Sequence, residues 1–295
     1  MKSIEYPQGE DCALLVHGLC SSPLEMQYVG RRMAKAGFAV SIPYLHGYGC
    51  DISKPGRQVR GWEAWLTELT NHFDLLKTRY RSVSVTGLCM GATLALGLAG
   101  ERGDEIAALS LLSTTLFYDG WNVSPFRFLL PIAYHTPLGI FYRKHRERPP
   151  YGLKNLRLRH WIEQGMKERD VSSVGAASIP TRGLYQAERL ISHVKGILPK
   201  IGAPTLLIHA TEDDVSSVRS PDFVEKHIGA SHVEQLRLDN SYHMITVDNE
   251  KEIVAQRSIS FFRDALRRQS METNRDGSTE KIAGDRPRQS FPPGT

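Results

Sequence analysis

Cysteine is scarce in this sequence of 295 residues, and long apolar runs are missing. The four cysteines, at positions 12, 20, 50 and 89, have neither the spacing of a metal site nor the density of a disulfide framework. No apolar run approaches the roughly 18 residues that a membrane-spanning helix needs. The first residues also lack the apolar core of a signal peptide. We therefore expect a cytoplasmic protein without a metal site or a membrane span.

The excess of positive charge is small and unevenly spread. Lys and Arg number 37 against 32 Asp and Glu, which gives a net charge of +5. Residues 141–170 alone hold nine basic and four acidic side chains. One interpretation is a solvated helical face, and the alternative is a basic rim that attracts an anionic substrate or an acidic carrier protein. No nucleic-acid motif accompanies these residues, so we expect no nucleic-acid partner.

Strand and helix patterns alternate along most of the chain, which is long enough for one large α/β domain. The predicted strands cover residues 12–16, 38–42, 83–88, 107–112, 204–210 and 233–238. The predicted helices cover residues 24–36, 61–80, 90–96, 221–227 and 250–267. This alternation is typical of a mostly parallel central sheet with helices on both faces.

The alternation breaks at residue 117, where an aromatic, basic and proline-bearing stretch begins. We interpret residues 117–200 as an inserted helical cap of the kind that covers an active site. The core is then made of residues 1–116 and 201–268. Residues 269–295 are polar and almost free of apolar side chains, so we expect them to be a disordered tail.

The chain is organised around residues 83–96, where a β-branched run leads into a small-residue and leucine-rich helix pattern. Between the two lies Gly87-Leu88-Cys89-Met90-Gly91, which is the nucleophile-elbow pattern with cysteine in the place of serine. The turn is so sharp that side chains two residues before and after the nucleophile would collide, and glycine removes that collision. The alternative is that these small residues only pack a helix against a strand.

Two further loops at the ends of predicted strands carry an acid and a histidine. Asp213 follows the strand at 204–210, and His243 follows the strand at 233–238. In this arrangement Cys89 would attack an acyl carbonyl, His243 would move the proton, and Asp213 would orient the imidazole. Asp214 is the rival for the acid.

Together with His17-Gly18 after the first strand, these motifs follow a known order of nucleophile, acid and histidine. Over residues 10–267 the sequence resembles the α/β-hydrolases, near the carboxylesterase and monoacylglycerol-lipase branch. The resemblance implies that the backbone N–H groups of Leu19 and Met90 form the oxyanion hole and that His17 shapes this loop. It also favours Asp213 as the acid, with Asp214 facing solvent or the start of a helix.

The expected reaction is hydrolysis of a small-molecule carboxylic ester or thioester through an acyl-cysteine, without a cofactor. Because a thioester reacts readily with amines and alcohols, acyl transfer to such an acceptor is the first alternative, with an acyl-carrier protein or a CoA thioester as donor. A catalytically weak binding protein on a hydrolase scaffold is the second. Cys89 could also be an engineered replacement of serine.

The cap supplies the candidate substrate-binding residues. They are the aromatic side chains of Phe117, Trp121 and Phe126, which would suit an apolar acyl chain or an aromatic acid. The alternative is that these side chains form only the core of the cap. Cys20 in the oxyanion loop and Cys50 in a glycine-rich loop are expected to be ordinary small side chains, and redox control by a disulfide is the alternative.

Overall fold

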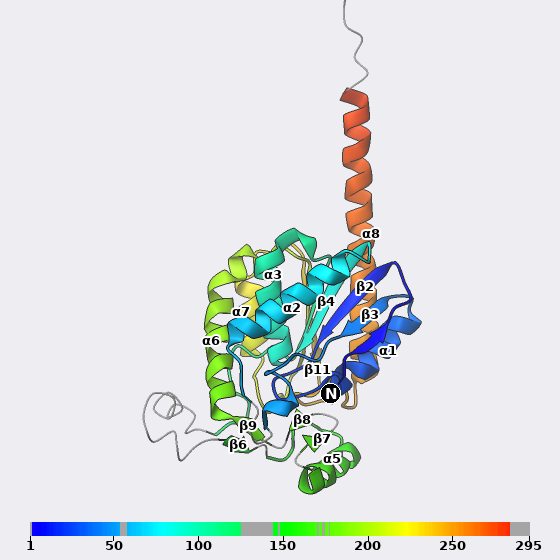
Figure 1. The fold of residues 1–295 in the computed structure, drawn as a ribbon. Coiled ribbons are helices and arrows are strands. Elements are labelled where there is room, and N and C mark those ends of the chain that lie inside the picture. Colours follow the sequence, from blue (N-terminus) through cyan, green and yellow to red (C-terminus); the bar gives the residue numbers. More distant parts are fainter. Residues whose placement is uncertain are drawn as a thin grey trace, which may run out of the picture.

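A seven-stranded sheet lies at the centre of the computed structural model (Figure 1). The structure describes residues 2–53, 58–124, 144–146, 148–169, 171–172, 175–176 and 178–283. In spatial order the strands are β1 (Ile4–Tyr6), β3 (Ala39–Ile42), β2 (Asp11–Val16), β4 (Ser82–Leu88), β5 (Leu109–Leu112), β10 (Thr205–Ala210) and β11 (Val233–Leu238). All neighbours are parallel except β1, which pairs antiparallel with β3. The predicted, mostly parallel sheet is confirmed, and only the edge strand β1 was missed.

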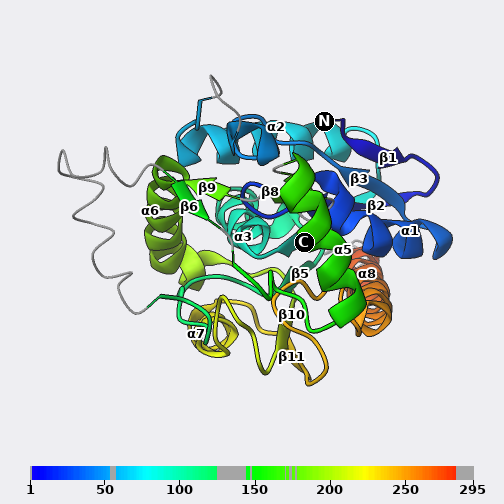
Figure 2. The same cartoon turned by 90° about the horizontal axis from the view of Figure 1, so that it is seen from below.

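Helices cover both faces of this sheet (Figure 2). One face carries α1 (Gln27–Lys35) and α8 (Lys251–Ala283), and the other carries α2 (Trp62–Lys77), α3 (Met90–Arg102), α6 (Thr181–Ile197) and α7 (Arg219–His227). Each face has its own apolar core, and β2 contributes alternate residues to the two. Leu14 and Val16 join the core under α2 and α3, whereas Ala13 and Leu15 join the core under α1 and α8. Burial on both sides explains why the strands are apolar throughout.

Within the predicted cap, the described residues form one helix and two small sheets before α6 begins. These elements are α5 (Leu156–Arg169), β6 (Lys144–Arg146) paired with β9 (Ser178–Pro180), and β7 (Val171–Ser172) paired with β8 (Gly175–Ala176). They lie together below the sheet in Figure 1. By contrast, α6 packs beside α2 and α3 through Leu190 and Val194, so this helix covers the sheet.

The last helix is longer than the sequence predicted. The expected end was residue 267, followed by a disordered tail, yet α8 continues to Ala283 and projects beyond the domain in Figure 1. Its buried side chains, such as Val254 and Phe262, belong to the part that packs on the sheet. Residues 268–271, which follow the expected end, are exposed. Residues 284–295 lie outside the described ranges.

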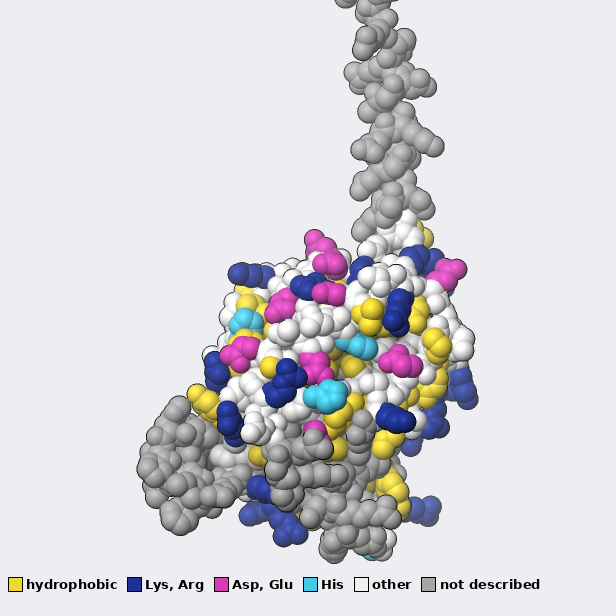
Figure 3. All heavy atoms as spheres, in the orientation of Figure 1, with side chains coloured by type: hydrophobic (Ala, Val, Ile, Leu, Met, Phe, Trp, Pro, Cys, Tyr) yellow, Lys and Arg dark blue, Asp and Glu magenta, His cyan; other side chains and the backbone are white. Residues whose placement is uncertain are grey.

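Charges of both signs are interspersed over the face on which α2 lies (Figure 3). Several are paired there, with 2.6 Å between Arg60 and Glu68 and 2.6 Å between Arg102 and Asp74. This face therefore presents no field of a single sign. None of the helices in the described ranges has an apolar stretch long enough to cross a bilayer.

Close packing where β2, β4 and α3 meet predicts that a side chain at Gly91 destabilises the protein. A Cβ atom on Gly91 would lie 2.3 Å from the carbonyl oxygen of Val16 and 2.5 Å from that of His17. We expect Gly91→Ala to lower the free energy of unfolding by about 2 kcal/mol or more, because backbone atoms must move apart. Urea unfolding followed by circular dichroism measures this change.

Gly196→Ala is the matched control, since a Cβ there meets nothing within 4 Å. Helix propensity should make that variant as stable as the parent or more stable, by up to about 1 kcal/mol. Equal unfolding midpoints for the two variants would contradict the steric account of the elbow.

Candidate active site

The elbow pattern at residues 87–91 forms a strained turn between β4 and α3. Cys89 has φ 57° and ψ −121°, a conformation that non-glycine residues rarely adopt. A Cβ atom on Gly87 would lie 2.3 Å from the carbonyl oxygen of Gly91, so the turn requires glycine on the strand side as well as on the helix side. Cys89 is partly exposed, and α3 begins at the next residue. The sulfur therefore stands at the N-terminal end of a helix, where the dipole favours negative charge.

His243 and Asp213, which lie far apart in the sequence, are joined by hydrogen bonds. Nδ1 of His243 is 2.9 Å from Oδ1 and 2.8 Å from Oδ2 of Asp213. Both side chains are buried, and Oδ1 also accepts the N–H groups of Val215 and Ser216 at 2.8 Å each. The carboxylate is thereby fixed at the end of β10 and orients the imidazole. Among the described residues, Nε2 has no partner with regular hydrogen-bond geometry.

The charges of this pair stabilise one another. Burial lowers the pKa of His243, but the Asp213 carboxylate and then the charge and contact of Cys89 raise the pKa well above its ordinary value. Burial raises the pKa of Asp213. The charge and the hydrogen bond of His243 lower that pKa by more, so the pKa of Asp213 lies below its ordinary value. A buried imidazolium is thus compensated by Asp213, and the ring interacts electrostatically with Cys89. This is the arrangement that a nucleophile–base–acid mechanism needs.

The expectation that Asp214 faces solvent or a helix start is wrong. Asp214 is 2% exposed, and its Oδ1 accepts the backbone N–H of His243 at 3.3 Å. Its Oδ2 accepts the N–H of Gly152 at 3.1 Å, and the carbonyl of Gly152 in turn accepts the N–H of Met244 at 2.8 Å. Asp214 therefore holds the loop of His243 against the cap segment, because buried backbone N–H groups need an acceptor. No hydrogen bond joins it to the imidazole, which pairs with Asp213.

The turn that follows β5 contacts both reacting side chains. The hydroxyl of Thr115 donates to the Cys89 sulfur at 3.5 Å, and the hydroxyl of Ser113 donates to the carbonyl of His243 at 2.7 Å. Ser113 has φ 44°, which turns the chain back toward the elbow. Sequence reasoning placed Ser113 and Thr115 at the end of a strand but missed their roles. The parallel sheet brings them to the site because strand ends meet at one edge.

The predicted oxyanion loop lies against the nucleophile. A Cβ on Gly18 would be 3.6 Å from Cβ of Cys89. No described residue accepts a hydrogen bond from the backbone N–H of Leu19 or Met90, and both groups are therefore available to a substrate oxygen. Their role as oxyanion donors stays a prediction that this geometry permits.

His17 is a structural residue of this loop. Its Nδ1–H donates to the Gly18 carbonyl at 2.9 Å, its Nε2 accepts the N–H of Leu45 at 3.4 Å, and burial lowers its pKa to about 4. The neutral ring agrees with the expectation that His17 shapes the loop. His209 is also buried and donates to the Ser216 carbonyl at 2.7 Å. Neither ring competes with His243 for proton transfer.

Sequence reasoning missed one buried acid beside the predicted oxyanion loop. Glu25 is 1% exposed, and its carboxylate accepts the N–H of Gly18 and the hydroxyl of Ser21. Its position in an ordinary helical pattern offered no signal, since a single Glu in a first turn is usually solvated.

The predicted substrate-binding aromatics occupy different surroundings. Phe117 packs on Phe223 of α7, with Nζ of Lys195 3.7 Å from its ring centroid. Trp121 is 58% exposed, and its Nε1 donates to the Glu212 carbonyl at 3.0 Å. Phe126 lies outside the described residues. Binding of substrate by these three side chains stays a prediction.

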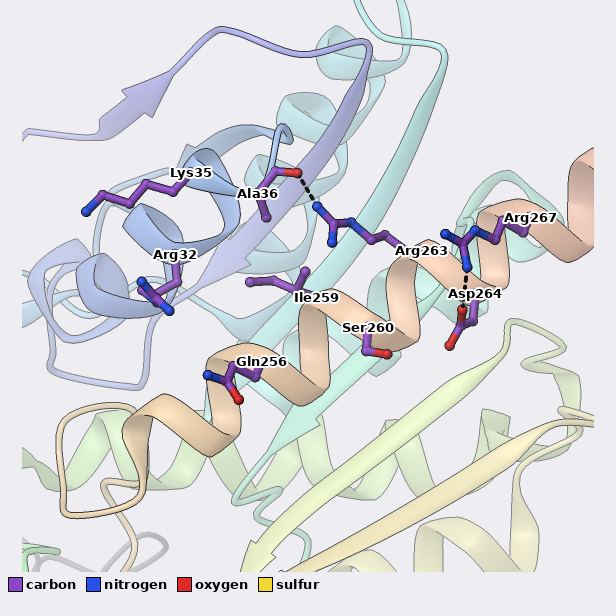
Figure 4. Close-up of a pocket in the computed structure, with 9 residues that line it drawn as sticks. All are labelled: Arg32, Lys35, Ala36, Gln256, Ile259, Ser260, Arg263, Asp264 and Arg267. Atoms are coloured by element: carbon purple, nitrogen blue, oxygen red, sulfur yellow. Dashed lines mark hydrogen bonds and ion pairs between the residues drawn. The ribbon is translucent and has the colours of Figure 1, made fainter.

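A surface hollow of about 530 Å³ lies between α1 and α8 (Figure 4). It is lined by Arg32, Lys35, Ala36, Gln256, Ile259, Ser260, Arg263, Asp264 and Arg267. Three of its cations have partners: Arg263 donates to the Ala36 carbonyl at 2.6 Å, Arg32 pairs with Glu252, and Arg267 lies 3.5 Å from Asp264. The hollow contains none of the predicted site residues. In the described part of the chain, no group of acidic, histidine and cysteine side chains could hold a metal ion.

Comparison with known proteins places the chain among hydrolases. Residues 9–252 match the model of the Hydrolase_4 family, described as serine aminopeptidase, S33. A thermostable monoacylglycerol lipase of Bacillus sp. (strain H-257) is 28% identical over 84% of this chain and 89% of its own. A carboxylesterase of Bacillus subtilis (strain 168) is 23% identical over 86% of this chain and 93% of its own.

Solved structures share the fold. A soluble variant of monoglyceride lipase from Saccharomyces cerevisiae, solved with a substrate analogue, has a TM-score of 0.75 to this chain and is 12% identical to it. The match covers 89% of this chain and 91% of that one. At this identity the likeness shows the fold alone, and the α/β-hydrolase fold predicted from the sequence is confirmed.

The ion pair predicts that the charge of His243 depends on Asp213. In Asp213→Asn the pKa of His243 should fall, because burial then acts without the compensating carboxylate. Protonated His243 stabilises the parent below about pH 6.5, and this contribution is lost as the pH rises through the raised pKa. NMR titration of the imidazole measures the shift. Glu212→Gln removes a more exposed neighbouring carboxylate and should leave the titration unchanged; an unchanged titration in Asp213→Asn would disprove the pairing.

The two backbone hydrogen bonds of Asp214 predict a stability difference between two substitutions. Asp214→Ala leaves the N–H groups of Gly152 and His243 buried without an acceptor, which should cost about 2–4 kcal/mol. Asp214→Asn keeps one acceptor oxygen and should cost about half as much. Denaturant unfolding measures both, with Glu212→Ala, an exposed acid, expected to change stability by less than about 1 kcal/mol. Equal effects of Ala and Asn at position 214 would contradict this role.

Proposed function

Because the chain belongs to the serine aminopeptidase S33 (Hydrolase_4) family of α/β-hydrolases, we propose that it hydrolyses carboxylic esters through an acyl intermediate on Cys89. The observation that carries this proposal is a nucleophilic side chain on a strained elbow, in electrostatic contact with the buried pair of His243 and Asp213. Relatives named as a monoacylglycerol lipase and a carboxylesterase support an ester as the substrate class.

In the proposed reaction, Cys89 passes its proton to Nε2 of His243 and attacks the acyl carbonyl carbon. The negative charge on the carbonyl oxygen is received by the N–H groups of Leu19 and Met90. His243 then protonates the departing alcohol as the C–O bond breaks, and Asp213 stabilises the imidazolium throughout. Water, deprotonated by His243, attacks the thioester and releases the carboxylic acid and the thiol of Cys89. This chain's own side chains and amides supply every group that the steps need.

Cysteine at the elbow departs from the family description, which names a serine enzyme. A thioester intermediate reacts with amines and alcohols as well as with water. Cys89 therefore favours a second candidate function, which is transfer of the acyl group from an ester or thioester to an amine or alcohol. Thioesters would also be suitable donors, because their carbonyl carbon is open to the same attack.

Three forms of the protein test the proposal on a monoacylglycerol and on p-nitrophenyl acyl esters. The parent should release the acid or p-nitrophenol, and Cys89→Ala should reduce turnover by at least about 10³-fold, because the nucleophile is removed. Cys89→Ser keeps a nucleophile in the same frame and should retain measurable hydrolysis. Intact-mass spectrometry should find the acyl adduct on the parent and on Cys89→Ser only.

Other outcomes are equally informative. A parent without turnover of any of these esters would refute ester hydrolysis. An acyl adduct that an amine or alcohol discharges faster than water would favour the transferase. Ligand binding that survives in Cys89→Ala, with no turnover in the parent, would favour a binding protein.

A further inference from the structure

A buried carboxylate supports the oxyanion loop from behind. Glu25 lies in η1 (Pro23–Met26), directly after the loop, and its side chain has no access to solvent. Gly18 donates its backbone N–H to Oε1, and Ser21 donates its hydroxyl to Oε2. Burial of a carboxylate is costly unless both oxygens are hydrogen-bonded, and both are bonded here to the loop itself.

The same loop is tied down at every residue around Leu19. The N–H of Cys20 donates to the Tyr48 carbonyl at 2.9 Å, and the carbonyl of Ser21 accepts the N–H of Cys50 at 2.8 Å. Cys20 has φ 56°, a strained conformation that persists only where its surroundings enforce it. No described residue accepts the N–H of Leu19, which stands between these anchored residues.

Glu25 is separated from the nucleophile by a single glycine. A Cβ on Gly18 would lie 3.2 Å from Oε1 of Glu25 and 3.6 Å from Cβ of Cys89. The titratable groups that face Glu25 are His243, whose charge acts on it, and Tyr48, on whose pKa both Glu25 and Cys89 act. Burial raises the pKa of Glu25 to about 7, against the opposing effects of Gly18, Ser21 and His243. Its charge therefore changes near neutral pH, beside the place where a reacting oxygen becomes negative.

We propose that Glu25 is the positioning residue of the oxyanion hole: by holding Gly18 and Ser21 it sets the direction of the Leu19 N–H. This inference rests on the proposed function and adds a residue to the same site. A negative charge on Glu25 opposes the developing oxyanion, so the neutral form is the faster one. Glu25 acts through the loop and through its field and does not touch the substrate.

Two substitutions separate geometry from charge. Glu25→Gln keeps the shape, accepts from Gly18 through its carbonyl oxygen, donates to Ser21 through its amide, and stays neutral at every pH. Its kcat should remain within about threefold of the parent at pH 6, while the ratio of parent to variant kcat falls as the pH rises through about 7. Glu25→Ala releases the loop and should lower kcat by about 10²-fold with a smaller change in KM.

A trifluoromethyl ketone provides a readout that needs no turnover. Attack by Cys89 converts it into a tetrahedral oxyanion adduct, so its affinity should fall in Glu25→Ala by a factor similar to the loss in kcat. The matched control is Glu252→Gln on α8, whose carboxylate accepts from Tyr28 at 2.6 Å and from Arg32, both on the adjoining α1. This control should keep the parent's kcat and a flat ratio across the pH range.

The outcomes are distinct from those that test ester hydrolysis. If the parent hydrolyses esters but Glu25→Ala keeps its kcat, the positioning role is overturned. A flat ratio for Glu25→Gln across the pH range overturns the effect of the Glu25 charge. Should Glu25→Ala fail to fold, Ser21→Ala takes its place: it removes one of the two bonds to Glu25 and should lower kcat, and an unchanged kcat would overturn the positioning role. If the parent turns over no ester, the proposed function fails, and the affinity for the fluoroketone still decides the role of Glu25.

Discussion

The tight contact between two backbones at the elbow is the constraint on which the rest of the site depends. Gly87 and Gly91 let β4 turn into α3 with the turn pressed against β2, and a side chain at either position would meet backbone atoms at 2.3 Å. This closeness holds Cys89 in its strained conformation and brings Gly18 against it. One steric condition therefore fixes Cys89, the N-terminus of α3 and the loop of Gly18 relative to one another.

Three buried carboxylates surround the site, and their environments give them different tasks. Asp213 faces the imidazole and has a lowered pKa, because its charge is paired. Asp214, one residue away, bonds only backbone N–H groups and has a pKa raised by burial. Glu25 bonds the Gly18 N–H and the Ser21 hydroxyl of the predicted oxyanion loop. The chemistry of each acid is set by what it touches and not by its place in the sequence.

The cap and the histidine loop form one hydrogen-bonded unit. Gly152 bonds both Asp214 and Met244, and the carboxylate of Asp248 accepts the N–H groups of Lys154 and Tyr242. A displacement of this cap segment would consequently move His243, because its neighbours Tyr242 and Met244 are bonded to Asp248 and Gly152. The frame that positions the triad is thus shared by the sheet and the inserted segment.

The sequence by itself determined the parallel sheet, the elbow and the order of Cys89, Asp213 and His243, because each rests on local periodicity or on a turn that only glycine permits. It could not determine what Asp214 and Glu25 do, since a carboxylate carries no local signal of its partners. Only the tertiary structure decided these roles: it buries Asp214 beside backbone donors from distant segments, and it buries Glu25 against the loop that precedes it in the chain. Burial decides which donors a carboxylate meets and how its pKa shifts, and burial depends on the packing of the whole chain and not on the neighbouring residues in the sequence.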